Sequence, residues 1–263
     1  MPNLSDIDTS ALQNIPTLMG IQWRFLHQSD STNSEIVRSL VDNPSEGLTV
    51  VADSQTDGRG RRGRSWHSEP GTGIYLSTLI RPNLLPEQLP ILTLMAGLAT
   101  VIAVNDLIPQ SAKLKWPNDL LLNGKKIAGI LCEYHPSTTK NHAVIIGIGI
   151  NVNHTYFPSD IKNTATSLKL ECGENIDRTS LIKRLITQLD FEYSELKNNR
   201  LQGLIDNWTH HTDLLGKTIT ITQNNQSIIA KAKHLDSIGR LVIEDESGQE
   251  IALDSGEVSI REK

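Results

Sequence analysis

The sequence predicts an α+β fold in which a larger domain is followed by a small C-terminal β-barrel. Over the first 212 residues, short apolar runs typical of strands alternate with longer runs of helical periodicity. Past residue 213 only short apolar runs remain, separated by glycine and polar turns. A chain of 263 residues is long enough to bury a substantial core. We therefore expect two domains, at 1–212 and 213–263.

Spacing of apolar residues predicts the helices of the larger domain. Thr32 and Glu35 form a possible capping box ahead of a short amphipathic helix that ends near Asn43. A long, largely buried helix is indicated by apolar residues that recur at helical spacing between Leu92 and Leu107. Further helices are expected over 177–197 and, shorter, up to about residue 208.

Strands are predicted from short apolar or β-branched runs bounded by turn residues. In the larger domain they lie near 48–52, 73–80, 113–116, 119–122, 126–133 and 143–150. In the barrel they lie near 217–221, 228–232, 241–243, 251–253 and 258–260.

A β-hairpin is indicated by Asn123-Gly124, the pair of residues that a two-residue type I′ turn prefers. With that turn, Leu121 faces Lys126. Alternation along the strands then predicts one shared sheet face for four side chains, those of Asp119, Leu121, Lys126 and Ala128.

Composition limits the possible functions. A formal net charge of -5 argues against general affinity for nucleic acid or membrane surfaces. Cys132 and Cys172 are too few for a disulfide framework. They are also too far apart for a C-x-x-C metal pair, and the histidines form no H-E-x-x-H motif, so we expect no metal ion held by protein side chains. The start of the chain lacks signal-peptide features, and the apolar stretch Ile91–Val104 is too short to span a bilayer. We expect a cytoplasmic protein.

The segment Gly58–Trp66 places four arginines among three glycines in an acidic chain. Its pattern is similar to dinucleotide-binding and P-loop motifs, but those open a helix, whereas residues 74–80 are predicted to be a strand. Both motifs are therefore rejected. An anion-binding loop and a solvated charged turn remain as alternatives, because arginine and exposed glycine amides suit anions while most charge runs are surface.

Two other segments have open interpretations. Lys126 in the hairpin is either a catalytic cation or a lysine that extends to solvent from the rim of the sheet. Gly147 and Gly149 in a strand mark either close approach of a ligand or tight packing of neighbouring strands.

Together these segments resemble the biotin protein ligases, also called biotin–[acetyl-CoA-carboxylase] ligases. The resemblance depends on Ser31-Thr-Asn33, Gln55, Gly58–Trp66, Lys115-Trp-Pro-Asn-Asp119, Lys126–Leu131, Gly147–Asn151 and Gly256–Arg261, which occur in the family's order. It implies a mixed-sheet catalytic domain of the biotin/lipoate ligase type with helices on one side, and an SH3-like C-terminal barrel. It also implies that biotin and ATP, with Mg²⁺, form biotinyl-5′-AMP, whose biotin passes to a lysine of biotin carboxyl carrier protein in acetyl-CoA carboxylase.

The resemblance also implies roles for individual residues. Biotin contacts are expected from Ser31, Thr32, Asn33, Gln55, Arg59, Gly60, Arg61, Lys126, Gly129 and Gly147. ATP or adenylate contacts are expected from Arg61, Arg64, Trp66, Asn118, Lys126, Asn151 and Arg261. Lys126 and Arg61 are expected to be catalytic, since attack of a carboxylate on a triphosphate needs cations.

Some biotin ligases carry an N-terminal winged helix-turn-helix, for which the residues before Ser31 leave too little room. We therefore expect no operator DNA binding. The acidic balance leads us to expect no membrane binding either, and homodimerisation stays open. Asp57 is an unexpected negative charge beside the loop. The rival functions are a lipoate or octanoyl ligase or transferase of the same fold and a non-enzymatic RNA-binding module.

Overall fold

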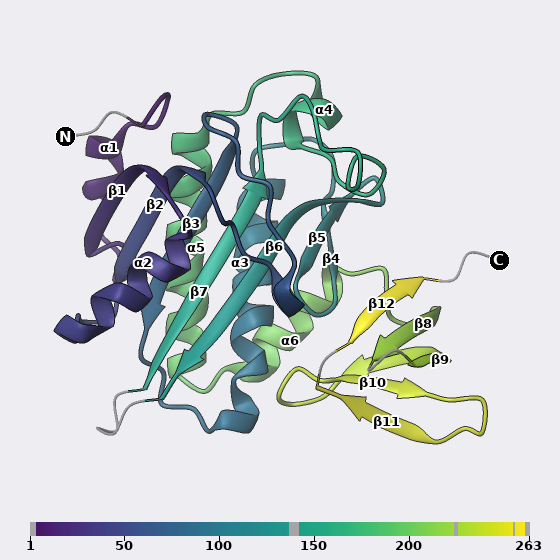
Figure 1. Ribbon diagram of the computed structural model, residues 1–263. Helices are drawn as coiled ribbons and strands as arrows, with labels where there is room; N and C mark the ends of the chain where they lie inside the picture. Colours follow the sequence, from purple (N-terminus) through teal and green to yellow (C-terminus); the bar gives the residue numbers. More distant parts are fainter. Residues whose placement is uncertain (1–3, 137–141, 224–225, 255, 261–263) are drawn as a thin grey trace.

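The computed structural model describes residues 4–136, 142–223, 226–254 and 256–260. It contains a seven-stranded sheet in the order β1-β2-β3-β7-β6-β5-β4 and a five-stranded sheet in the order β11-β10-β9-β8-β12 (Figure 1). β1 and β2 are parallel and the other pairs are antiparallel, so the larger sheet is mixed. The predicted α+β class, with a mixed sheet followed by a smaller β domain, is confirmed.

The larger sheet consists of β1 (Gln22–Ser29), β2 (Leu48–Gln55), β3 (Gly73–Ile80), β4 (Lys113–Lys115), β5 (Asp119–Leu122), β6 (Lys125–His135) and β7 (Ala143–Asn151). The smaller sheet consists of β8 (Thr218–Gln223), β9 (Gln226–Leu235), β10 (Leu241–Glu244), β11 (Glu250–Leu253) and β12 (Glu257–Ile260). The α-helices are α1 (Thr9–Gln13), α2 (Thr32–Ser39), α3 (Pro90–Asn105), α4 (Leu168–Cys172), α5 (Arg178–Lys197) and α6 (Leu201–His210). Three 3₁₀ turns are η1 (Leu40–Asp42), η2 (Arg61–Gly63) and η3 (Pro86–Gln88).

The long helices α3 and α5 pack together on one face of the larger sheet, as expected, and α6 joins them there (Figure 1). Their apolar residues form the main core with the sheet, including Met95, Leu185 and Trp208. The short helix α2 lies on the opposite face, where Ile36 packs in a second cluster with residues of β2, β3 and β7. On this second face of the larger sheet, α2 covers only part of the strands.

By length and composition alone, Pro86–Asn105 would suit a membrane span. This segment is longer than the apolar stretch Ile91–Val104 that the sequence indicated. However, 67% of its most apolar window is buried inside the fold, as in the core helix of a soluble protein. Burial against the sheet and α5 accounts for its apolar composition.

The hairpin between β5 and β6 forms as predicted, with Leu121 paired to Lys126 and positive φ at Asn123 and Gly124. The expectation for Ala128 is wrong. The register shifts between Leu120 and Leu121, because Ile127 is an extra residue in β6, a β-bulge. Gly129 therefore pairs with Asp119 and takes the place on this face that alternation had assigned to Ala128.

Other predicted elements are confirmed within a few residues, with some local differences. The N-cap of α2 is Ser31, not Thr32, and makes no side-chain capping bond. The elements β1, α1 and α4 were not predicted. In the segment before β1, Met19 is buried, whereas Ile21 is 64% exposed.

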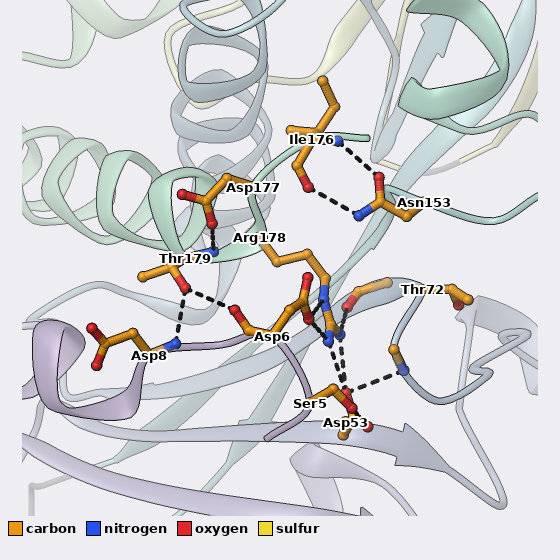
Figure 2. Close-up of polar contacts among 12 residues, drawn as sticks. Ser5, Asp6, Asp8, Asp53, Thr72, Asn153, Ile176, Asp177, Arg178 and Thr179 are labelled. Atoms are coloured by element: carbon orange, nitrogen blue, oxygen red, sulfur yellow. Dashed lines mark hydrogen bonds and ion pairs between the residues drawn. The ribbon is translucent and has the colours of Figure 1, made fainter. Parts of the chain in front are cut away.

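A fully buried arginine attaches the N-terminal segment to the larger sheet (Figure 2). Arg178, at the start of α5, donates to Asp53 of β2 at 3.0 Å, to the Gly73 carbonyl at 2.9 Å and to Asp6. Ser5 donates to the same Asp53 carboxylate at 2.7 Å. Because a buried charge is costly unless it is paired, these carboxylates hold residues 5–6 against α5.

The turn between β9 and β10 of the smaller sheet contacts the larger domain. The Trp116 indole N–H donates to the Gly239 carbonyl at 3.2 Å, and Trp116 is 2% exposed. Gly239 has a φ of +85°, and a Cβ built there would lie 2.6 Å from Leu94 of α3. The positive φ and the nearness of Leu94 both favour glycine at this position in the turn between β9 and β10.

Candidate active site

A cavity opens on the face of the larger sheet that also carries α2. The start of α2, β2, the arginine–glycine loop, β3, β6 and β7 all contribute to its walls. It is lined by Ser31, Thr32, Asn33, Gln55, Arg59, Gly60, Arg61, Trp66, Tyr75, Asn118, Lys126, Gly129, Ile130, Leu131, Gly147, Ile148 and Gly149. All ten residues expected to contact biotin thus line one cavity. Trp66 and Asn118, which were expected to contact ATP or the adenylate, line it as well.

Lys126 extends into this cavity from the hairpin and is held from two sides. Its Nζ lies 2.6 Å from an oxygen of Asp119 and 5.3 Å from the centre of the Trp66 ring. Its backbone N–H donates to the Thr164 carbonyl at 2.8 Å, and its carbonyl accepts from Thr166 at 3.0 Å. The ammonium therefore has a fixed position, on a side chain that is 33% exposed, and the solvated-lysine interpretation is not supported.

Arg61 reaches the cavity from η2 and is held by Asn118. The guanidinium donates to the Asn118 side-chain oxygen at 2.8 Å, and the Asn118 amide donates to the Ile130 carbonyl at 3.0 Å. Burial and the neighbouring Arg62 lower the pKa of Arg61 from its usual value, and the guanidinium remains cationic. Its partner is neutral, so its charge is available to an anion.

The loop that carries Arg59 and Arg61 is a tight turn between β2 and β3. The Trp66 N–H donates to the Gly58 carbonyl at 2.7 Å and the Gly60 N–H to the Arg64 carbonyl at 2.6 Å. A Cβ on Gly58 would lie 2.4 Å from the Trp66 carbonyl oxygen, which explains the glycine. The next strand or α-helix is β3, so the rejection of a P-loop is confirmed.

Buried polar side chains line one end of the cavity. The Gln55 oxygen accepts from the Thr32 N–H at 2.9 Å, and the Gln55 amide donates to Ser68 at 2.9 Å. The Ser77 hydroxyl donates to the Asn33 side-chain oxygen and lies 2.7 Å from the Thr32 hydroxyl. Donors and acceptors fixed in this way suit a small ligand with both kinds of polar group.

Three glycines of β6 and β7 contribute to the cavity wall. A Cβ on Gly147 would lie 2.3 Å from the Asn33 side-chain oxygen. On Gly149 or Gly129 it would lie 2.5 or 3.0 Å from the Trp66 ring. The glycine pattern in β7 therefore reflects close approach of site residues to the strand.

Sequence reasoning missed three residues of this region. Asp119 holds Lys126, although the sequence suggested no role for it. Tyr75 lines the cavity, and its hydroxyl lies 3.3 Å from a ring nitrogen of the buried His154. Glu133 is not among the lining residues but contacts two that are, Asn33 and Arg59. Alternation along β6 could have suggested Glu133, because it lies on the face of Gly129.

Three residues of the expected nucleotide set are not in the cavity wall. Arg64 is exposed at the outer end of the loop. Asn151 is 4% exposed and donates to the Thr166 carbonyl at 3.0 Å. Arg261 lies outside the described residues. Their nucleotide contacts stay predictions.

Across the part of the chain that the structure describes, no group of three or more His, Cys, Asp or Glu side chains is arranged to hold a metal ion. Carboxylates near the cavity are engaged by cations, as Asp119 is by Lys126. A divalent ion would therefore depend on ligands supplied by a substrate, which is usual for Mg²⁺ bound with phosphates.

Comparisons with known proteins agree with this geometry. Residues 26–151 match the biotin/lipoate A/B protein ligase family, and residues 214–261 match the biotin protein ligase C-terminal domain. The chain is 36% identical over 230 residues to the bifunctional ligase/repressor BirA of Bacillus subtilis, covering 86% of this chain and 71% of that protein. It is 32% identical over 261 residues to the biotin–[acetyl-CoA-carboxylase] ligase of Mycobacterium tuberculosis, covering 96% and 95%.

A solved structure is also similar over nearly the whole chain. It is the biotin protein ligase from Aquifex aeolicus in complex with biotin and ATP, with a TM-score of 0.79 and 32% identity. The similarity covers 92% of this chain and 99% of that one.

Proposed function

The chain belongs to the biotin protein ligase family, and from this premise we propose how its own residues carry out the reaction. The enzyme is an ATP-dependent ligase that joins biotin to AMP and then to a protein lysine. The observation that carries the proposal is the convergence of Arg61 and Lys126, from separate segments, on one cavity with a buried polar end.

In the first step an oxygen of the biotin carboxylate bonds to the α-phosphorus of ATP. The bond between the α-phosphorus and the bridging oxygen breaks, and pyrophosphate leaves. Lys126 and Arg61 stabilise the negative charge that the carboxylate and phosphate bring together, because both cations are already in position. Asp119 and Asn118 hold these two side chains in position.

The polar end of the cavity is proposed to take the ureido ring of biotin. Gln55 and Thr32 offer hydrogen-bonding groups there, and the absence of a side chain at Gly147 leaves room beside Asn33. Trp66 is proposed to cover the adenylate, because its ring already lies against Gly149 and beside Lys126. Arg64, Asn151 and Arg261 are proposed as outer nucleotide contacts.

ATP is proposed to arrive with Mg²⁺ on its phosphates, where the ion reduces repulsion between the triphosphate and the biotin carboxylate. In the second step the carrier lysine amine attacks the acyl carbon, loses a proton and displaces AMP. The partner is the biotin carrier of a carboxylase, proposed to be biotin carboxyl carrier protein of acetyl-CoA carboxylase.

Several finer statements are proposals as well. We propose that the chain does not bind operator DNA, which is supported by its net charge of -5. A cytoplasmic location is supported by the free cysteines Cys132 and Cys172. A domain division near residue 213 is supported by the break between α6 and β8. An SH3-like barrel and a homodimer are the remaining proposals.

The test is ATP–pyrophosphate exchange with biotin, lipoate or octanoate as the acid. We expect exchange that depends on biotin and is absent with the other two acids. Exchange with lipoate or octanoate but not with biotin would instead identify a lipoate-type ligase.

A further inference from the structure

We propose that Glu133 is a positioning residue of the biotin site, because its carboxylate holds Asn33 and Arg59 where the cavity needs them. The inference rests on the proposed function and adds a residue to the same site. Glu133 is not itself in the cavity wall, so it acts through the two side chains that are.

Glu133 lies on the correct strand and face for this role. It is in β6, where it pairs with Ile145 of β7, and alternation places it on the face of Gly129 and Leu131. Both of those residues line the cavity. The Glu133 side chain therefore projects on the substrate side of the sheet, next to the site, with 25% exposed.

One carboxylate oxygen of Glu133 receives two donors from different segments. The Asn33 side-chain amide donates to it at 2.6 Å and the Arg59 guanidinium at 2.8 Å. Asn33 belongs to the start of α2 and Arg59 to the arginine–glycine loop. Glu133 thus connects β6 directly to both elements.

The contact with Asn33 fixes which way the amide points. With its NH₂ on Glu133, the Asn33 oxygen accepts from Ser77 and lies where Gly147 leaves space. Asn33 is 3% exposed, so without Glu133 a buried amide would lose its strong acceptor. A rotated amide would present the wrong polar group to the ligand.

The contact with Arg59 sets the charge of the site. Arg59 is 36% exposed, so this ion pair contributes little to overall stability. The effect of this ion pair is local, because the pair directs Arg59 to a protein carboxylate. Lys126 is likewise paired, with Asp119, whereas the Asn118 partner of Arg61 is neutral. Of the two loop arginines in the cavity wall, Arg61 is therefore the one whose neutral partner leaves its charge available to a substrate anion.

The experiment compares Glu133→Ala, Glu133→Gln and the control Glu244→Gln. Glu244 is also a strand carboxylate that accepts from a cation, Lys233 at 2.7 Å, but it lies in the smaller sheet. Biotin binding is measured by calorimetry on the folded proteins, and biotin-dependent pyrophosphate exchange gives KM and kcat. Thermal unfolding shows that each variant folds.

We expect Glu133→Ala to weaken biotin binding and raise the biotin KM by about tenfold or more, with kcat nearly unchanged. The biotin affinity and biotin KM of Glu133→Gln should fall between those of Glu133→Ala and the wild type, because the uncharged glutamine oxygen still accepts both donors. Glu244→Gln should match the wild type.

Unchanged biotin affinity in both Glu133 variants would overturn the inference, as would an equal loss in Glu244→Gln. If the wild type binds biotin but catalyses no exchange, the proposed function fails while the positioning role is still tested by affinity. A wild type that binds no biotin would refute both.

Discussion

The Lys126 ammonium lies 2.6 Å from the Asp119 carboxylate across the hairpin that Asn123-Gly124 closes. The bulge at Ile127 places Gly129, with no side chain, next to this pair on the same face. The cation therefore has both a fixed partner and free space beside it. This arrangement places a stabilising charge at the cavity before any substrate binds.

Replacing Lys126 tests the charge directly. Lys126→Met should reduce biotin-dependent pyrophosphate exchange by about a hundredfold or more, since it removes a preorganised cation from the transition state. Lys125→Met is the matched control, because Lys125 is the exposed neighbour in the same strand. Equal activity of the two variants would contradict the role of Lys126.

Removing Arg61 should release the adenylate early. In Arg61→Gly the loop loses its bond to Asn118 and its cation, so biotinyl-AMP is expected to escape and label bystander lysines. The measurement is biotin incorporated into an unrelated protein in the same tube. Arg62→Gly is the control, since Arg62 is exposed and has a φ of +57° that glycine adopts readily. Carrier-only labelling by Arg61→Gly, with adenylate retained, would refute this expectation.

The turn at Gly239 should support catalysis from outside the site. Gly239→Ala would place a methyl group 2.6 Å from Leu94 and displace the turn from Trp116, which precedes Asn118 and Asp119. Gly248→Ala has similar backbone strain, at a φ of +83°, but no atom within 4 Å of its added Cβ. We expect exchange activity to fall several-fold more in Gly239→Ala than in Gly248→Ala. Equal losses of exchange activity in the two variants would show that backbone strain alone causes the loss, which would contradict a supporting role for the turn at Gly239.

Acid should destabilise the fold through His154. Burial lowers the pKa of this fully buried histidine to about 4, below the ordinary value of 6.5. Between these values the unfolded chain binds a proton that the folded chain does not, so stability present above pH 6.5 falls as the pH drops toward 4. The predicted loss from this group is on the order of 3 kcal/mol. Denaturant unfolding across this pH range should show that the free energy of unfolding depends less on pH in His154→Gln than in the wild type. Equal slopes in the two proteins would contradict the role of His154.

Local signals predicted much of the fold and of the site. The Asn-Gly turn fixed the pairing of Leu121 with Lys126, and glycines with arginines marked the loop. The bulge at Ile127 depends on pairing across strands, so alternation alone misplaced Ala128. Asp119 and Glu133 were missed as partners because their contacts join residues that only the folded sheet and loop bring together. Strand β1 went unpredicted because it lies at the edge of the sheet, where its exposed residues weaken the apolar pattern.

The most direct test of the account is incubation of the chain with biotin, ATP, Mg²⁺ and an apo carrier domain, followed by intact mass measurement of the carrier. We predict that the carrier gains the mass of a single biotinyl group. The gain should require both biotin and ATP and disappear when the acceptor lysine is replaced by arginine. A carrier whose mass is unchanged, under conditions in which the chain is folded, would contradict the central claim that Arg61 and Lys126 converge to activate biotin.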